Sequence, residues 1–338
     1  MAHNCLIIGG EIAALRAAKD LLALNIPVTL LNPSQRLGET TSMFQRGVSD
    51  FAFSKDILNP YLEGLEDNPN LILINNAKIR KIVQKYPPFE VEIQRNGAME
   101  TITAGAVIIA SGFKPFNAKL LEEYGYGYLQ GVMTIFDLEA AIQKQEWPIS
   151  DKTERVIFIL CIGSRSLREG ANPDCSTYCC SYSINQALHI KKEFPNVETC
   201  LMYMDIRTVA AHEFLYNEAR KSGVIFIRGR PSAIERSNSK LIAIFDDTLA
   251  GGLNMLPADL VVLAVGGMPF PGIDKIAADF AVELTPNRFV KIQEKPVQTT
   301  IEGVFACGSA SDGVKNIQQS LSEGGAAAMA VMQFLKGR

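Results

Sequence analysis

Apolar residues along this chain gather in short runs, and segments with helical spacing separate them. The run at residues 5–8 is followed by a glycine turn, by an amphipathic helix pattern that reaches Leu22, and by a second run at 28–31. Short continuous apolar runs are typical of strands buried on both faces, and strands that alternate with helices build parallel β-α-β units. The pattern therefore predicts an α/β protein with a parallel sheet.

The same alternation predicts two domains. Runs that begin at Ala106 and Gly303, each ending in a turn of small residues, are expected to extend the N-terminal sheet. The middle of the chain has predicted strands of its own, at 155–160, 199–204, 224–228, 241–245 and 260–265. The divisions that we expect are a discontinuous domain at 1–116 and 270–338, an irregular connection with a short helix at 117–150, and an inserted αβ domain at 151–269.

Composition excludes some classes of function. The 338 residues are 47% apolar and 20% charged, with a formal net charge of −3. This balance gives no electrostatic reason to expect nucleic acid binding. No apolar run is long enough to span a bilayer. Residues 1–4 lack a basic stretch and lead directly into the first predicted strand, so we expect no signal peptide and a cytoplasmic protein.

Four of the seven cysteines fall between residues 161 and 180. Cys161 follows an apolar run and is expected at the carboxyl end of a buried strand, where open α/β sheets bind ligands. Cys175, Cys179 and Cys180 follow a polar loop and open a helical pattern. Four converging thiolates suit an all-sulfur site, either an iron–sulfur cluster or zinc, although adjacent cysteines are unusual zinc ligands. Inert or disulfide-bonded cysteines are the alternative, and a reducing compartment disfavours the disulfides.

The first β-α-β unit carries a partial dinucleotide fingerprint. In the pattern G-x-G-x-x-G/A, Gly9 takes the first place and Ala14 the third, but Glu11 stands where the second glycine lets the backbone approach a pyrophosphate. Asn32 replaces the acid that usually binds the adenosine ribose. We expect Glu11 to repel a pyrophosphate unless it turns outward or meets a counter-charge such as Arg36. A nucleotide-free α/β domain is the alternative.

Two later segments favour a flavin. The turn at 110–112 and the segment 303–309, followed by a small-residue helix, correspond to the A-T-G turn and the terminal G-D segment of two-dinucleotide flavoproteins. After the first strand of the inserted domain, by contrast, the residues at 161–165 replace the second glycine-rich fingerprint. The residues expected to contact FAD are Gly9, Gly10, Glu11, Ile12, Ala13, Ala14, Asn32, Gly38, Ala110, Ser111, Gly112, Gly308, Ser309, Asn316 and Ile317.

With these parts assembled, the chain resembles the heterodisulfide reductase A family over most of its length. The segments that carry the resemblance are FKPFNAKLLEEYGYG, CIGSR with the later CSTYCC, MYMDIRT, GVIFIRGR and VFACGSASDGVKNI. The resemblance implies a thioredoxin-reductase-like flavoprotein with two dinucleotide-binding-type domains. It also implies FAD and one [4Fe–4S] cluster, with the cluster ligands at Cys161, Cys175, Cys179 and Cys180.

The chain lacks the C-x₂-C-x₂-C runs of the ferredoxin-type modules that the methanogen family members carry. It therefore resembles the compact A-like component of cytoplasmic sulfur-oxidising complexes. That resemblance implies B-like and C-like iron–sulfur partners, a lipoate-binding protein and a homodimer.

Three other functions are alternatives to the one that the resemblance implies. A component that feeds adenylylsulfate reductase from quinone is one alternative. A free-standing FAD-dependent disulfide reductase is another, although it predicts a C-x-x-C pair and a second glycine fingerprint, which the sequence lacks. A scaffold that has lost its flavin is the third, and Glu11 and Asn32 are the residues that favour it.

Overall fold

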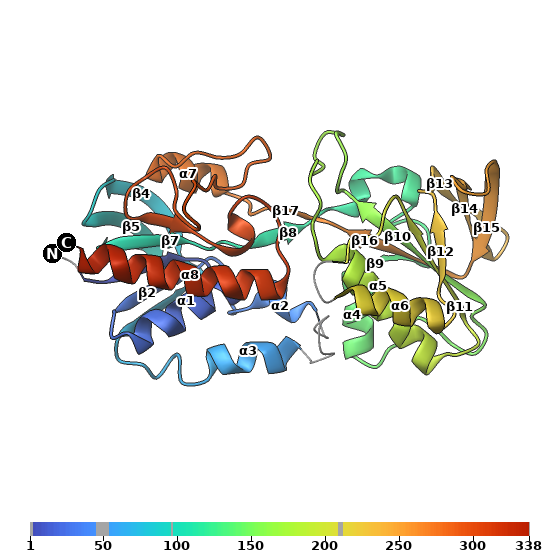
Figure 1. Ribbon diagram of the computed structural model, residues 1–338, viewed down its shortest axis with the longest axis horizontal. Coiled ribbons are helices and arrows are strands. Elements are labelled where there is room, and N and C mark those ends of the chain that lie inside the picture. Colours follow the sequence, from blue (N-terminus) through green and yellow to red (C-terminus); the bar gives the residue numbers. More distant parts are fainter. Residues whose placement is uncertain (1–2, 45–53, 96, 209–211, 338) are drawn as a thin grey trace. The chain divides into compact units, whose positions relative to one another are not determined.

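The computed structural model describes residues 3–44, 54–95, 97–208 and 212–337, which fold into two compact units (Figure 1). The described residues of unit 1 fall within Met1–Ser42, Phe53–Lys114 and Pro269–Arg338. Those of unit 2 fall within Met43–Ala52 and Pro115–Met268. The chain passes between the units through β8 (Phe113–Pro115) and β17 (Gly267–Pro269), which pair with each other.

Unit 1 is built on a parallel sheet of five strands in the order β18-β7-β1-β2-β3. The bounds are β1 Cys5–Ile8, β2 Val28–Asn32, β3 Leu71–Asn75, β7 Ala106–Ile109 and β18 Val304–Ala306. The predicted strand at 5–8 has these same bounds, and the strands at 28–31 and 106–109 are confirmed as β2 and β7. The carboxyl ends of β1 and β7 are adjacent, which brings the turns after them together.

Both faces of this sheet are covered. Within β1, alternate side chains point to opposite sides, so Cys5 and Ile7 belong to one core cluster and Leu6 and Ile8 to another. The helices α1 (Ile12–Ala23) and α8 (Ile317–Lys336) cover the first side and lie side by side in Figure 1. The second side carries the antiparallel strands β4 (Lys78–Gln84), β5 (Phe89–Arg95) and β6 (Ala98–Ala104), with α7 (Ile273–Phe280).

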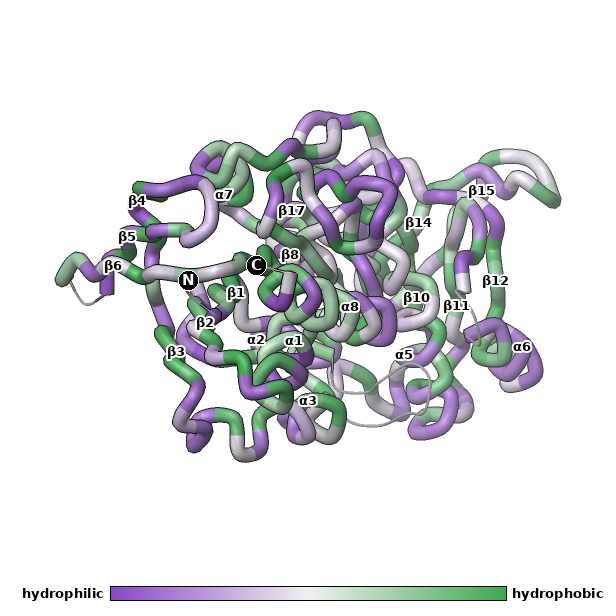
Figure 2. Tube along the Cα trace, turned by 60° about the vertical axis from the view of Figure 1, so that its left-hand side comes forward, coloured by the Kyte–Doolittle hydropathy of each residue, from purple (hydrophilic) through white to green (hydrophobic). Residues whose placement is uncertain are grey.

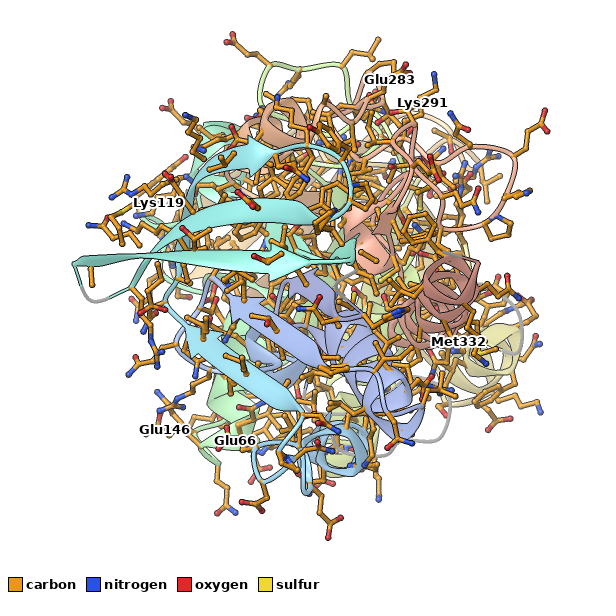
Figure 3. All side chains as sticks on the ribbon, turned by 90° about the vertical axis from the view of Figure 1, so that its left-hand side faces the viewer. Glu66, Lys119, Glu146, Glu283, Lys291 and Met332 are labelled. Atoms are coloured by element: carbon orange, nitrogen blue, oxygen red, sulfur yellow. The ribbon has the colours of Figure 1, made fainter. Side chains whose placement is uncertain are left out.

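The contact between α1 and α8 depends on small residues. A Cβ atom placed on Gly324 of α8 would lie 2.5 Å from the carbonyl oxygen of Ala13 in α1, so the two backbones touch at this point. Two shorter helices, α2 (Glu39–Ser42) and α3 (Ser54–Leu62), follow β2. On the surface of the same unit, Glu283 and Lys291 form an ion pair at 2.8 Å (Figure 3).

Unit 2 has its own parallel sheet, in the order β12-β11-β10-β16-β9. Its strands are β9 Val132–Thr134, β10 Arg155–Ile162, β11 Glu198–Tyr203, β12 Ile225–Arg228 and β16 Leu260–Val265. Its helices are α4 Ile135–Gln143, α5 Cys179–Glu193 and α6 Glu213–Lys221. Hydrophilic and hydrophobic colours alternate along α6 in Figure 2, and its buried residues Leu215 and Ala219 are one turn apart.

Two parts of unit 2 differ from the simple alternation of strand and helix. The strand predicted at 241–245 lies in a separate antiparallel sheet, formed by β13 (Ala233–Ser237), β14 (Lys240–Asp246) and β15 (Leu253–Ala258). Residues 117–150, predicted as a connection with a short helix, contain β9 and α4, and β9 pairs with β16. No helix in the described part of the chain is long and apolar enough to cross a membrane.

Candidate functional site

A glycine cradle lies where β1 and β7 end. Gly9 has a φ of +139°, and a Cβ atom there would lie 2.0 Å from the carbonyl oxygen of Ala110, so only glycine fits. On the neighbouring turn, Gly112 has a left-handed φ of +72°. The hydroxyl of Ser111 is buried and has no hydrogen-bond partner among the described residues. Backbone thus approaches backbone closely here, and one buried polar atom is left for a ligand.

Asn32, the last residue of β2, is buried and packs against Gly10. A Cβ atom on Gly10 would lie 2.3 Å from its side-chain oxygen. The side-chain amide of Asn32 donates to the Asn75 oxygen at 2.9 Å, and its own oxygen accepts from the Ser34 N–H at 3.2 Å. Only 1% of Asn32 is exposed. The residue at the ribose position is therefore engaged in a local network.

Glu11 turns neither outward nor toward Arg36. Its carboxylate accepts hydrogen bonds from the N–H groups of Thr40 at 2.9 Å and Thr41 at 3.1 Å, and from the Thr41 hydroxyl at 3.1 Å. Burial raises the pKa of Glu11, and these hydrogen bonds oppose the rise. The N–H of Gly38 donates to the carbonyl of Gly10 at 2.7 Å, so hydrogen bonds from Gly38, Thr40 and Thr41 all join the turn after β1 to the segment 38–41.

A cavity of about 470 Å³ opens beyond the ends of β2 and β3 in unit 1. Its lining comes from the loop after β2, from the last residue of β3 and from the segment after α3, where Glu66 is labelled in Figure 3. The lining residues are Gln35, Arg36, Leu37, Leu62, Gly64, Glu66, Asp67 and Asn75. This is the side of the sheet on which α/β folds bind the adenosine half of a dinucleotide.

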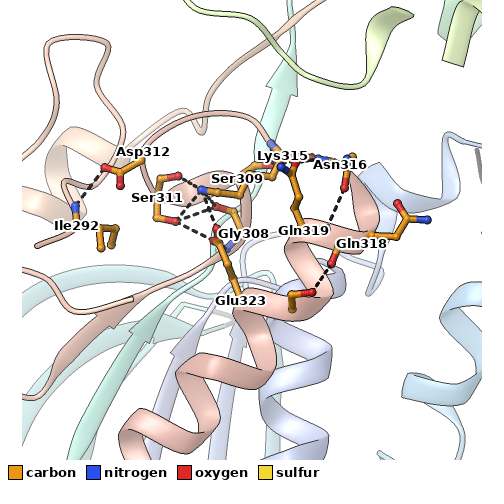
Figure 4. Close-up of polar contacts among 11 residues, drawn as sticks. Ile292, Gly308, Ser309, Ser311, Asp312, Lys315, Asn316, Gln318, Gln319 and Glu323 are labelled. Atoms are coloured by element: carbon orange, nitrogen blue, oxygen red, sulfur yellow. Dashed lines mark hydrogen bonds and ion pairs between the residues drawn. The ribbon is translucent and has the colours of Figure 1, made fainter. Parts of the chain in front are cut away.

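The C-terminal segment forms a polar network around a half-buried carboxylate (Figure 4). Glu323 of α8 accepts from the Gly308 N–H at 2.9 Å and from the Ser311 hydroxyl at 3.1 Å, and Lys315 lies 3.4 Å from its second oxygen. Burial raises the pKa of Glu323, and the Lys315 ammonium opposes the rise. Sequence reasoning missed this pair. The available signal was that Glu323 is the single acidic residue of α8.

The predicted flavin residues of this segment lie at the start of α8. Asn316 is the N-cap: its side chain accepts from the Gln319 N–H at 2.9 Å, and the Gln319 side chain accepts from the Asn316 N–H at 3.2 Å. Ile317 is the first helical residue. The Ser309 hydroxyl accepts from the Lys315 N–H at 2.9 Å. A flavin role for these residues stays a prediction.

In unit 2, the structure places the four predicted cysteine ligands on one strand, one loop and one helix. Cys161 is the penultimate residue of β10, at a register shift, and has a φ of +61°. Cys179 and Cys180 are the first two residues of α5, and Cys175 is half-buried in the loop before it. All four are free thiols. A left-handed φ is uncommon for residues other than glycine, and such positions cluster at functional sites.

The thiols are close enough to affect one another's ionisation. Burial, and then the neighbouring Cys180, Cys161 and Cys175, raise the pKa of Cys179 well above its ordinary value. Burial chiefly raises the pKa of Cys180 to about 12, with further contributions from Cys161 and Cys175. Each thiolate would thus be unfavourable beside the others without a cation among them. Among the described residues, no group of three or more His, Cys, Asp or Glu side chains is arranged to hold a single metal ion.

Positive charge and hydrogen-bond donors surround the thiols. Burial raises the pKa of Cys161, and the Arg165 guanidinium opposes the rise. Arg165 also forms an ion pair with Asp205. The Thr177 N–H donates to the Cys175 sulfur at 3.4 Å. These are the kinds of contact that orient sulfur ligands and tune their donor strength.

A serine pair anchors the loop between Cys161 and α5. The hydroxyls of Ser164 and Ser176 lie 2.7 Å apart, and Ser176 accepts from the Gly267 N–H at 2.9 Å. A Cβ atom on Gly266 would lie 1.8 Å from the Ser164 hydroxyl oxygen. The bond from Gly267 to Ser176 joins residues 91 positions apart in the chain, so no local pattern indicates it. The loop is therefore held against the end of β16.

The family and the fold define the class of protein. Residues 3–159 match the pyridine nucleotide-disulphide oxidoreductase family. The fold is similar to that of Lactococcus lactis thioredoxin reductase, with a TM-score of 0.68, coverage of 99% of this chain and 100% of that chain, and 16% identity. The predicted thioredoxin-reductase-like α/β fold is confirmed by this likeness, and the family match over residues 3–159 supports an oxidoreductase.

The chain is also similar in sequence to proteins of known function. The chain is 30% identical to the A component of the "Ferredoxin:CoB-CoM heterodisulfide reductase" of Methanosarcina acetivorans, over 69% of this chain and 34% of the relative. It is 29% identical to the iron–sulfur A component of the "CoB--CoM heterodisulfide reductase" of Methanocaldococcus jannaschii, over 97% of this chain and 64% of the relative. These homologues are A components of heterodisulfide reductases, so the predicted resemblance to that family is confirmed. It spans between 34% and 64% of the length of these two relatives.

Proposed function

We propose that the chain is an electron-transfer component that holds one FAD and one [4Fe–4S] cluster and works in a heterodisulfide reductase-like complex. The observation that carries the proposal is the placement of four free thiols in unit 2, at the end of β10, in the loop before α5 and at the start of α5. The homologues, named as components of reductases, support a flavin-dependent disulfide oxidoreductase role in electron transfer.

The cradle of unit 1 fits a flavin dinucleotide at most positions. There is no room for a side chain at Gly9, and Gly112 has a left-handed φ. The buried Ser111 hydroxyl has no hydrogen-bond partner among the described residues. FAD supplies conversion between two-electron and one-electron steps when it is bound. The residues that would hold its pyrophosphate are Gly9, Gly10, Ala13 and Ala14, and those near its ring would be Gly308, Ser309 and Ile317. Glu11 is the exception.

The donor set of unit 2 fits a cluster better than a single ion. One ion draws its ligands into a single coordination sphere, whereas a cubane cluster has several irons, each of which takes one thiolate. The proposed ligands are Cys161, Cys175, Cys179 and Cys180. Around them, Thr177 donates a hydrogen bond to the Cys175 sulfur and Arg165 places positive charge beside Cys161. The Arg165 guanidinium favours the thiolate form of Cys161.

For the cellular context we propose cytoplasmic oxidation of sulfur compounds. The partners would be B-like and C-like iron–sulfur proteins, with a lipoate-binding protein as an indirect partner, and the chain would form a homodimer. A complex that feeds adenylylsulfate reductase from quinone is the alternative assembly.

The test is anaerobic purification followed by measurement of flavin content, iron content and the EPR spectrum of the reduced protein. We expect about one FAD and four irons per chain, as one [4Fe–4S] cluster requires. Cys180→Ser should lose or convert the cluster and keep FAD, whereas the buried Cys200→Ser serves as the matched control. Retention of iron and signal by Cys180→Ser, or their loss from Cys200→Ser, would refute the ligand assignment.

A further inference from the structure

The side chain of Glu11 crosses the crevice in which a pyrophosphate is expected. In a dinucleotide fingerprint, the second glycine marks the point at which the backbone comes closest to the pyrophosphate, and Glu11 stands at that position. Its Cγ atom lies 2.9 Å from where a Cβ of Gly112 would be, so the side chain passes the turn after β7. Its carboxylate then reaches α2, at Thr40 and Thr41.

The donors that hold this carboxylate are those that an oxyanion ligand would use. Two backbone N–H groups and one hydroxyl converge on it, at 2.9 to 3.1 Å. Backbone N–H groups beside a glycine turn are the usual partners of cofactor phosphates, and carboxylate and phosphate oxygens accept hydrogen bonds in the same way. The nearby Gly38 N–H is already bonded to Gly10. One set of donors cannot serve the Glu11 carboxylate and a phosphate together.

The ribose side offers no compensation. A carboxylate at the end of β2 would accept hydrogen bonds from ribose hydroxyls. Asn32 stands there instead, and its amide and its oxygen are both bonded within the protein. Glu11 and Asn32, the two departures from the fingerprint, therefore both oppose dinucleotide binding. Each makes hydrogen bonds within the protein to polar groups that a dinucleotide would otherwise satisfy.

We propose that the Glu11 carboxylate is an internal substitute for a cofactor phosphate. It competes with a dinucleotide phosphate for the Thr40 and Thr41 donors, and it must leave them when a dinucleotide binds. This inference rests on the proposed FAD site and adds the residue that sets its affinity. Because of this competition, FAD binds more weakly than it would with glycine at position 11.

Glu11→Gly, Glu11→Gln and the wild-type chain, purified anaerobically and freed of flavin, provide the test. The matched control is Glu39→Gln, which removes the same charge from an exposed position in α2. Titration calorimetry gives the FAD dissociation constant, and thermal unfolding is followed with and without inorganic pyrophosphate. We expect Glu11→Gly to bind FAD about 10- to 100-fold more tightly, the range for one hydrogen bond to a charged group. Glu39→Gln should match the wild type.

Glu11→Gln keeps the shape and one acceptor but has no charge, so we expect its FAD affinity to lie between those of the wild type and Glu11→Gly. The Glu11→Gln variant also tests the inference if Glu11→Gly does not fold. An FAD affinity of Glu11→Gln equal to or below that of the wild type overturns the inference. Pyrophosphate should raise the melting temperature of Glu11→Gly and leave that of the wild type unchanged.

The experiment can refute the internal substitute and the flavin site independently. If all variants bind FAD equally, the internal substitute is refuted and the flavin site stands. If no variant binds FAD but pyrophosphate stabilises Glu11→Gly alone, the flavin assignment fails and the internal substitute stands.

Discussion

Replacement of Gly266 by alanine should release the loop that carries Cys175. Gly266 has an ordinary backbone, so the cost comes from the added methyl group. Its carbon would lie 1.8 Å from the Ser164 hydroxyl oxygen and 2.7 Å from that of Ser176, and both serines are at most 2% exposed. Neither hydroxyl can move without breaking the bond between them.

The magnitude follows from what must break. Loss of the serine–serine bond costs about 1 kcal/mol, and a buried Gly267 N–H left without its Ser176 acceptor costs about 1–3 kcal/mol. Overpacking of a filled site adds about 1–3 kcal/mol. We therefore expect Gly266→Ala to lower the free energy of unfolding by about 3–7 kcal/mol, a large part of the total for a domain.

The assay is urea unfolding of the reduced chain, together with the rate at which a disulfide reagent modifies Cys175. The matched control combines Gly266→Ala with Ser164→Gly, which removes the nearest obstacle. The double variant should be less destabilised than the sum of the single variants by about 1–3 kcal/mol. The reasoning fails if Gly266→Ala unfolds within about 0.5 kcal/mol of the wild type, the usual range of neutral surface substitutions, or if the two changes simply add.

Adjacent glycines of α8 should respond in opposite ways. Gly324→Ala brings a methyl group to 2.5 Å from the Ala13 carbonyl oxygen and should destabilise the folded chain by about 1–3 kcal/mol. Gly325→Ala meets only ordinary contacts and should stabilise the folded chain by about 0.5–1 kcal/mol. Equal melting temperatures of the two variants would contradict this. Cys200 gives a pH dependence, because burial chiefly, and then Glu198, raise the pKa of its thiol to about 12. The folded state thus keeps a proton that the unfolded chain releases near pH ~8.5, so the advantage over Cys200→Ala in urea unfolding should be full below that pH and shrink as the pH rises toward about 12.

Local pattern accounts for much of the fold and for part of the site. The strand at β1 and the helix that starts at Cys179 follow from runs and spacing near them in the chain. The antiparallel sheet β13-β14-β15 is only partly predicted by the pattern, because β13 (AIERS) is short and largely polar and β15 (LNMLPA) contains a proline, which is unfavourable inside a strand. The partners of Glu11 lie about 30 residues away, at Thr40 and Thr41. A hydrogen bond over that distance depends on the folded loop, so the sequence could suggest a counter-charge but not backbone amides.

The way in which α8 and β18 complete unit 1 has a consequence for synthesis on the ribosome. Strand β1 pairs early with β2, but β18 pairs with β7, and α8 packs on α1, only after nearly the whole chain has emerged. Nearly all of unit 2 comes from the continuous segment 115–268. Domains fold as units during translation, so we expect the segment with the four thiols to resist protease in nascent chains stalled before β18, while unit 1 is still cut. The cysteine site would then be ready for iron before the nucleotide cradle can close.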